Sequence, residues 1–224
     1  YFIINKMSTL VLVFDTETDG KWESGKENPH LMQLSYIVYD TNERKIVKIY
    51  NKYIKQEVDI DFSSEAFKIN NITKEQCETG VTVSEAIVEF YHDYMQVEKV
   101  IAHNIEFDKK IMIGEMLRNH YKIIKLMDKS PYLPPTVTMF RDVYNENSNI
   151  MLFCTMYSGK NITNITMEKS NGKGTFLKSP KLIELYQTMF NETPDNLHDA
   201  LIDSVLCLRC YIKMRFKYTI PKSE

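Results

Sequence analysis

Short, nearly continuous apolar runs alternate with amphipathic stretches along this chain, and their periods predict a mixed sheet surrounded by helices. Residues 8–16 (STLVLVFDT) form an apolar run rich in Val and Leu, which is typical of a strand buried on both faces of a sheet. The other predicted strands are residues 31–39, 45–54, 100–102 and 150–156. A polar turn at residues 40–44 joins the second strand to the third, which predicts an antiparallel meander.

Helices are predicted where apolar residues recur every three to four positions. The predicted helices are residues 84–95, 107–120, 180–190 and 196–217. Ser84 is the expected N-cap of the first, and the second follows a strand that ends near His103, which makes a strand–turn–helix unit. The polar residues 161–178 are expected to form a surface excursion. This order predicts an α/β fold with a central five-stranded mixed sheet flanked by helices.

Composition and charge narrow the class of protein. With 224 residues and 43% hydrophobic content, we expect one domain over residues 1–224, with residues 1–7 as a non-native or disordered start. The formal net charge of −2 argues against a protein that coats nucleic acid by bulk electrostatics, so any polyanion must be held locally. No segment resembles a membrane span or a secretory leader, and the four cysteines do not form a disulfide framework. These features predict an intracellular protein, cytoplasmic or nuclear, without a membrane partner.

Asp15 and Glu17 end the first predicted strand two residues apart. The alternation of a strand therefore directs both carboxylates to one face, and such a pair at the end of a central strand is a candidate metal site. On its own, however, the segment DTETDG reads more readily as a polar turn.

Two further segments bring acidic residues to element ends. In AHNIEFD, Asn104 stands at the turn after a buried strand, and Asp108 falls in the first turn of the next helix, where its charge is favourable. In LHDALIDS, Asp199 and Asp203 are four residues apart and share a helix face, whereas about 140° separates His198 from Asp203 at roughly 100° per residue. Periodicity alone does not choose the ligand here, and helix geometry would favour the pair Asp199 and Asp203.

Taken together, FDTET, NIEFD and HDALID resemble the three motifs of the DEDD exonucleases of the DNA-polymerase proofreading type. A DxE, an Nx₃D and an Hx₄D in this order are much more specific than any one of them alone. The resemblance is to the subgroup with an active-site histidine, called DEDDh or DnaQ-like, because the sister subgroup has a tyrosine in the last motif and no Tyr lies between Phe190 and Asp203. It implies a ribonuclease H-like fold.

The resemblance also implies roles for individual residues. It assigns metal ligation to Asp15, Glu17, Asp108 and Asp203, and contacts with the substrate to Thr16, Thr18, His103, Asn104 and Phe107. It makes His198 the general base and leaves Asp199 a bystander. Hard carboxylate ligands suit two divalent cations, Mg²⁺ or Mn²⁺, which together neutralise the attacking and the leaving oxygen of a phosphodiester. A histidine with an ordinary pKa of about 6.5 can accept the proton of the attacking water near neutral pH.

The implied activity is 3′→5′ hydrolysis of DNA from single-stranded or frayed 3′ ends, with release of nucleoside 5′-monophosphates. The alternatives are a 3′→5′ exoribonuclease of the same fold and a catalytically reduced nucleic-acid-binding or polymerase-associated module. A polymerase or repair complex is a further candidate partner.

Local basic surface is needed to hold the substrate's phosphates, because the whole chain is weakly acidic. The candidate clusters are Lys169, Lys173, Lys178 and Lys181 around the excursion, and Arg209, Lys213, Arg215, Lys217 and Lys222 near the end of the chain. Trp22, Phe107 and Tyr157 are the candidates for stacking on unpaired bases.

Overall fold

A mixed sheet forms the centre of the protein in a computed structural model that describes residues 9–140, 150–194 and 198–221. Its strands are β1 (Leu10–Thr18), β2 (Leu31–Asp40), β3 (Lys45–Lys55), β4 (Val81–Thr82), β5 (Lys99–Ala102) and β6 (Met151–Cys154). They lie in the order β4-β3-β2-β1-β5-β6, with β1, β2 and β3 antiparallel and with β5 parallel to both β1 and β6. The strand with the most continuous apolar run is therefore central, as its sequence predicts.

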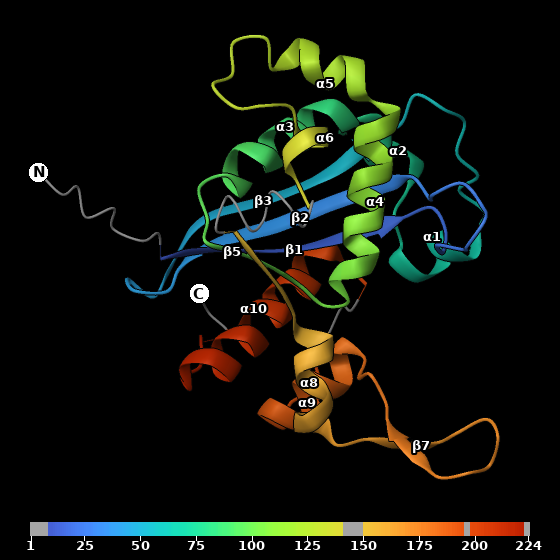
Figure 1. Ribbon diagram of the computed structural model, residues 1–224. Coiled ribbons are helices and arrows are strands. Elements are labelled where there is room, and N and C mark those ends of the chain that lie inside the picture. Colours follow the sequence, from blue (N-terminus) through green and yellow to red (C-terminus); the bar gives the residue numbers. More distant parts are fainter. Residues whose placement is uncertain (1–8, 141–149, 195–197, 222–224) are drawn as a thin grey trace, which may run out of the picture.

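Helices cover both faces of this sheet (Figure 1). They are α1 (Glu65–Asn70), α2 (Lys74–Glu78), α3 (Val83–Tyr94), α4 (Ile105–Arg118), α5 (His120–Leu126), α6 (Pro135–Thr138), α8 (Thr155–Thr163), α9 (Leu182–Phe190) and α10 (Ala200–Phe216). Leu12 and Phe14 of β1 belong to the core under α3 and α4, whereas Val11 and Val13 pack with α10 on the other face. The alternation along β1 thus decides which face each of its later side chains meets.

The short helices α1, α2, α5 and α6 were not among the predicted helices, and four further details differ from the expectations drawn from the sequence. The sheet has a sixth strand, β4, whose two residues at the edge are too few to leave a hydrophobic period. The N-cap of α3 is Thr82 and not Ser84, because Thr82 and Glu85 form a reciprocal capping box. Strand β6 ends at Cys154, two residues earlier than expected, since α8 begins at Thr155.

The fourth difference concerns residues 161–178, which extend the helix α8 and then form a two-stranded hairpin, β7 (Thr166–Glu168) and β8 (Thr175–Leu177). The hairpin projects from the body of the molecule beside α8 and α9 (Figure 1). Among the described residues, no helix has both the length and the apolar character needed to cross a membrane.

Candidate active site

Three carboxylates meet where β1 ends and α10 begins. Asp15, Glu17 and Asp203 each offer an oxygen, and these oxygens all lie within 4.8 Å of one another. Asp15 and Glu17 continue the alternation of Val11 and Val13, so they face α10, which contributes Asp203 from its first turn. The alternation of a strand and the start of one helix are enough to bring these three groups together.

Asp199 has a different task, although it precedes Asp203 by only four residues. It is the N-cap of α10, and its Oδ1 accepts hydrogen bonds from the backbone amides of Leu201 (3.0 Å) and Ile202 (3.1 Å). Its Oδ2 accepts a third from Gln33 Nε2 at 3.1 Å. Helix geometry favoured Asp199 and Asp203 as a pair on one face of a helix, and this argument was wrong. Asp199 lies outside α10, so the rotation of about 100° per helical residue does not apply to it.

Asp108 comes from α4, on the other face of β1. It is 2% exposed, and its Oδ1 accepts hydrogen bonds from the backbone amide of Thr16 (3.1 Å) and from Thr16 Oγ1 (2.8 Å). Asp108 is not a member of the group of three carboxylates, but its negative charge raises the pKa of both Asp15 and Glu17. Thr16, which was expected to contact the substrate, is 5% exposed and orients Asp108, and it also lines the cavity beside Glu17.

Burial and mutual repulsion raise the pKa of four carboxyl groups: Asp15, Glu17, Asp108 and Asp203. Burial raises the pKa of Asp15 well above its ordinary value, and the charges of Asp108 and Asp203 raise it further. Burial, assisted by Asp203, raises the pKa of Glu17 to about 8. Burial likewise raises the pKa of Asp108 to about 7. It raises the pKa of Asp203 to about 6, although the charge of His198 acts to lower that pKa. The cluster is therefore costly to ionise without a compensating positive charge.

Divalent cations fit this set of donors. Oδ1 of Asp203 is buried and has no hydrogen-bond partner among the residues that the structure describes, although it lies within the carboxylate group. Four carboxylates without a thiolate or an imidazole in the ligand group are the donor chemistry that Mg²⁺ and Mn²⁺ prefer. Asp15, Glu17 and Asp203 would hold the cation from the α10 side, with Asp108 approaching from α4.

A cavity on one side of the carboxylates contains the predicted base. It measures about 490 Å³, and Asp15, Asp203, His198, His103 and Asn104 line it. His198 has a φ of 68°, in the left-handed region that few residues other than glycine adopt, and its side chain is exposed. Because it lies beside Asp15 and Asp203 and is open to solvent, it can meet a water molecule at the cluster.

His103 is held in place by its neighbours. Its Nδ1 lies 3.0 Å from Thr155 Oγ1 and its Nε2 lies 3.0 Å from the carbonyl oxygen of Pro180. Burial lowers the pKa of His103 to about 4, partly offset by the Pro180 carbonyl, so its ring is neutral at pH 7. It lines the cavity, as expected of a substrate-contacting residue, and it also fastens the ends of β5 and α8 to the segment before α9. Asn104, the other expected contact, precedes α4 with a φ of 68°.

A second cavity, of about 450 Å³, opens on the other side of Glu17. Phe107, Thr18, Asn70 and Ile69 line it, together with the start of the segment 19–30. Phe107 and Ile69 give this cavity an apolar wall, while Thr18 Oγ1 is occupied by a 2.6 Å hydrogen bond to the carbonyl of Gly20. The carboxylates thus lie between two hollows, one lined by Phe107 and one by His198.

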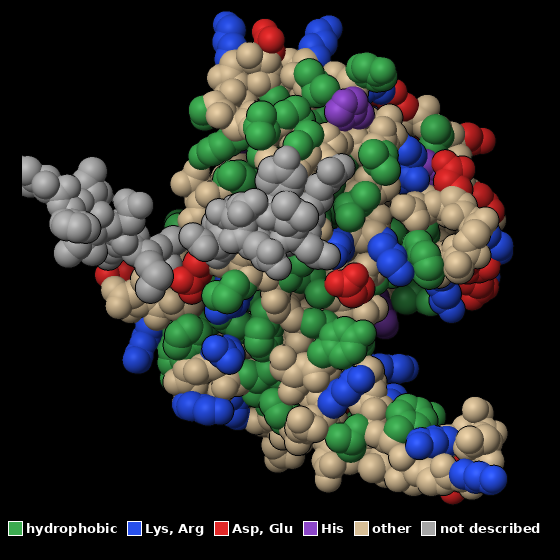
Figure 2. Space-filling view, in the orientation of Figure 1, with side chains coloured by type: hydrophobic (Ala, Val, Ile, Leu, Met, Phe, Trp, Pro, Cys, Tyr) green, Lys and Arg blue, Asp and Glu red, His purple; other side chains and the backbone are tan. Residues whose placement is uncertain are grey.

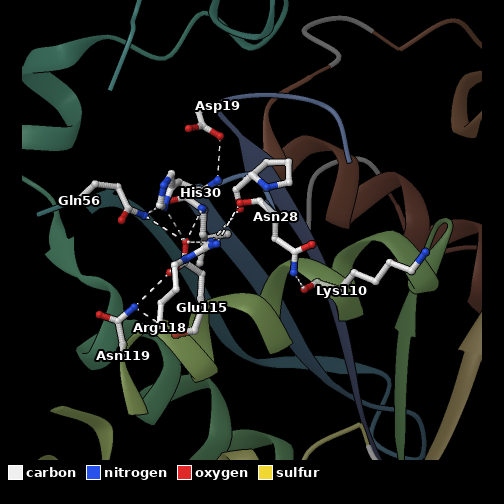
Figure 3. A network of polar contacts seen from close by, with 10 residues as sticks. Asp19, Asn28, His30, Gln56, Lys110, Glu115, Arg118 and Asn119 are labelled. Carbon is white, nitrogen blue, oxygen red and sulfur yellow. Dashed lines mark hydrogen bonds and ion pairs between the residues drawn. The ribbon is translucent and has the colours of Figure 1, made fainter. Parts of the chain in front are cut away.

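The segment 19–30 is fastened to α4 by a network that the sequence did not reveal (Figure 3). Its centre is Glu115, which is 0% exposed and accepts hydrogen bonds from Arg118 (2.7 Å) and from the backbone amide of Leu31 (2.9 Å). Arg118 also donates to the carbonyl oxygens of Asn28 and Pro29, both at 2.9 Å. The sequence signal for this network was a glutamate among the apolar residues of α4. A buried carboxylate needs a partner, so its position indicated a paired charge.

Trp22 lies in the same segment, and its position changes its expected role. Its indole Nε1 donates to Asn28 Oδ1 at 2.9 Å, and Lys110 Nζ lies 3.6 Å from the centre of its ring. Asn28 in turn donates to the carbonyl of Lys110 at 3.3 Å. Trp22 therefore helps to hold the segment on α4, and it offers less ring surface for base stacking than its sequence position suggested.

The basic cluster near the end of the chain has structural partners. Arg209 is 6% exposed and donates to the carbonyl oxygen of Ile220 at 3.0 Å, and Lys213 contacts Phe190 and the carbonyl of Met189. Arg209 and Lys213 therefore support the packing of α10, whereas Arg215 and Lys217 are exposed. Lys222, the last member of the cluster, lies outside the described residues.

The strand order and the carboxylates at the end of the central strand are those of a ribonuclease H-like fold with a candidate nuclease site. Comparison with family models agrees: the model of the exonuclease family named RNase T matches residues 12–211. The chain belongs to this exonuclease family. A sequence search of the curated proteins gave no match.

Solved structures share the fold at low sequence identity. Exonuclease I of E. coli in complex with a dT13 oligonucleotide is 15% identical with a TM-score of 0.62, over 94% of this chain and 42% of that one. The zinc-bound form of the exonuclease I complex with single-stranded DNA is 15% identical with a TM-score of 0.63, over 93% of this chain and 41% of that one. Cell-death related nuclease 4 is 14% identical with a TM-score of 0.60, over 95% and 65%. This chain thus spans about two fifths of exonuclease I.

Proposed function

We propose that this protein is a 3′→5′ exonuclease that hydrolyses DNA from single-stranded or frayed 3′ ends to nucleoside 5′-monophosphates. The observation that supports this most is the convergence of Asp15, Glu17 and Asp203 within 4.8 Å beside a cavity that also contains His198. Asp108 completes the ligand set from the other side of β1. Two divalent cations bound there, Mg²⁺ or Mn²⁺, would supply the charge neutralisation that phosphodiester hydrolysis requires.

His198 is assigned the general base, which places the protein in the subgroup of these exonucleases with an active-site histidine. Its exposed imidazole lies in the cavity next to Asp15 and Asp203, where it can take the proton of an attacking water. Histidine suits this step because its ordinary pKa lies close to neutrality. His103, the other histidine of the cavity, is unsuited because both of its ring nitrogens already have partners.

The two cavities suggest how a strand would cross the site. We assign the 3′-terminal nucleotide to the cavity beside Glu17, because Phe107 and Ile69 offer an apolar wall to a sugar or a base. The strand that precedes it would then lie in the cavity of His198, where Asn104 and Lys181 face the phosphate chain. The exonuclease I structures with oligonucleotides, which share this fold, make single-stranded DNA the first substrate to test.

Digestion of a single-stranded DNA 20-mer labelled at its 5′ end tests the proposal. With Mg²⁺ or Mn²⁺ we expect a ladder that shortens from the 3′ end with release of mononucleotides, and no reaction with EDTA. The same assay on an RNA 20-mer and on a 3′-mismatched duplex distinguishes an exoribonuclease and a proofreading preference. Binding without hydrolysis under all metal conditions would overturn the proposal in favour of a catalytically reduced module.

A further inference from the structure

The hairpin formed by β7 and β8 grows out of the wall of the catalytic cavity. Met156, in the first turn of α8, lines that cavity, and so do Ser179, Pro180 and Lys181, which follow the hairpin. Both ends of the excursion between residues 156 and 181 therefore lie where the strand in the site would emerge. A ligand that extends beyond the cavity on this side meets the hairpin next.

The base of the hairpin is firmly attached, so its position relative to the cavity is defined. His103 bonds to the carbonyl of Pro180, and Lys178 donates its backbone amide to Ile165 at 2.8 Å, which closes the base. Helix α8 lies tightly on α9: a Cβ added to Gly159 would come within 2.8 Å of Leu185 Cδ1. The β7–β8 hairpin, residues 165–178, is called the arm below. The arm is thus held at its base, whereas its two strands are almost entirely exposed.

The charge of this region is opposite to that of the whole protein. Residues 156–183 contain five lysines and one glutamate, in a chain whose formal net charge is −2. Lys178 is paired with Glu184, but Lys169 and Lys173 have no carboxylate partner among the residues that the structure describes. Lysine side chains are visible along the projecting arm in Figure 2, next to hydrophobic ones. Such an isolated basic arm on an acidic chain is suited to a polyanion.

Apolar and aromatic side chains share one face of the hairpin with the charge. Met167 pairs with Phe176 across the strands, and they are 47% and 45% exposed. Lys169 lies two residues after Met167, and its amide bonds to Gly174, so the strand alternation puts it on the same face. On α8, Tyr157 is 56% exposed and Lys160 Nζ lies 4.9 Å from the centre of its ring.

We propose that the β7–β8 arm and the exposed face of α8 bind the single-stranded part of the substrate upstream of the scissile bond. Lys169 and Lys173 would contact its phosphates, while Phe176 and Tyr157 would stack on its bases. Lysines interleaved with exposed aromatic rings are the combination that binds single strands without reading their sequence, whereas a duplex hides its base faces. The arm would then make affinity depend on the length of the strand. This inference rests on the proposed function, because it needs a strand in the catalytic cavity.

The arm also has the right dimensions. From Ile165 to the turn at Gly172 the chain advances seven residues, and at roughly 3.3 Å per residue this spans at most about 23 Å. At roughly 3.4 Å per nucleotide along a stacked strand, that length matches about seven nucleotides. Substrates shorter than this cannot reach the end of the arm.

The test compares a DNA dinucleotide with a single-stranded 20-mer as substrates of the full chain. For the double variant Lys169→Glu, Lys173→Glu we expect the ratio of kcat/KM for the 20-mer to that for the dinucleotide to fall at least tenfold. For Phe176→Ala the loss should be about tenfold, since stacking contributes roughly 1–3 kcal/mol per base. The matched control is Lys125→Glu, Lys129→Glu, which reverses two exposed lysines outside the arm and should leave the ratio unchanged.

Binding of the fluorescently labelled 20-mer in EDTA, which removes the cation-dependent part of binding and leaves the contacts of the arm, gives a second readout. The slope of log Kd against log salt concentration should decrease by about 1.4 in the double lysine variant, because each phosphate contact to a single strand contributes about 0.7. An unchanged ratio and slope in an active enzyme would overturn the role of the arm, as would a larger loss on a duplex than on the single strand. If the wild-type protein degrades neither substrate, the proposed function itself fails.

Discussion

Glu115 shows what a single buried charge contributes to this structure. Burial alone would raise the pKa of its carboxyl, but His30, Arg118 and the amide of Leu31 outweigh that effect and hold the pKa below its ordinary value. Its contribution to stability is therefore present above the unfolded pKa of about 4.3 and is lost as the pH falls through the lowered folded pKa. The carboxylate thereby connects α4, which carries Asp108, to the segment that follows β1.

Replacement of Glu115 by Ala should destabilise the protein by about 3 kcal/mol, because it leaves Arg118 and the Leu31 amide without their acceptor. For a chain of this size that corresponds to a fall in thermal midpoint of roughly 6–12 °C at pH 7. The control is Glu57→Ala, which removes an exposed partner of Lys122 and should change the midpoint by about 2 °C or less. Equal effects of the two substitutions would show that the network does not stabilise the fold.

His198→Ala tests the general base. We expect kcat on single-stranded DNA to fall by about 10²–10⁴-fold, while cation-dependent binding of the strand is retained, because the carboxylates of Asp15, Glu17 and Asp203 are intact. His92→Ala, an exposed histidine on α3, is the matched control and should retain the wild-type rate. A wild-type rate in His198→Ala would remove this residue from the mechanism.

At the scale of elements, hydrophobic periodicity predicted the long elements that pack against the core and missed the short or exposed ones. The apolar runs of β1, β2, β3 and β5, and the amphipathic period of α3, each have a core to face, so the pattern located them. The two-residue β4 and the exposed β7–β8 hairpin bury too little for any period to appear. The excursion was therefore predicted as surface, but its hairpin was not.

The same limit applies to the site. Strand alternation correctly placed Asp15 and Glu17 on one face, since that rule needs only the backbone. Helix rotation failed for Asp199, because the exact first residue of α10 decides whether the rule applies. The bond between Thr16 and Asp108 joins residues 92 positions apart, and no local pattern reports such a contact.

The capping box of α3 provides a test of an element boundary. Thr82 Oγ1 accepts from the amide of Glu85 at 3.3 Å, and the Glu85 carboxylate accepts from the Thr82 amide at 2.9 Å. Thr82→Ala should therefore lower the free energy of unfolding by about 1 kcal/mol in urea denaturation. Ser84→Ala, at the position that the sequence indicated, should cost less, because Ser84 lies within the helix. A larger loss for Ser84→Ala would contradict this N-cap.

For the whole molecule, the carboxylate cluster makes stability depend on both pH and divalent cations. The folded pKa values of about 8 for Glu17, 7 for Asp108 and 6 for Asp203 all lie above the values of an unfolded chain. The folded protein without cations therefore binds more protons than the unfolded chain between about pH 4 and pH 8, and its stability falls as the pH rises through this window. Cations compete with these protons, so they should stabilise more at the higher pH.

Thermal unfolding at pH 5.5 and pH 8, with EDTA or with Mg²⁺, measures this coupling. We expect Mg²⁺ at about 100 times its Kd to add about 2.7 kcal/mol to the free energy of unfolding at pH 8, or roughly 5–11 °C to the thermal midpoint, and clearly less at pH 5.5.

Asp203→Asn should raise the thermal midpoint in EDTA at pH 8, because it removes a buried charge that repels Asp15, and it should lose most of the Mg²⁺ effect. Glu65→Gln, at an exposed site on α1, should behave as wild type in both respects. A midpoint that Mg²⁺ moves equally in wild type and in Asp203→Asn would place the cation elsewhere, and the four carboxylates would then need another reason to lie together.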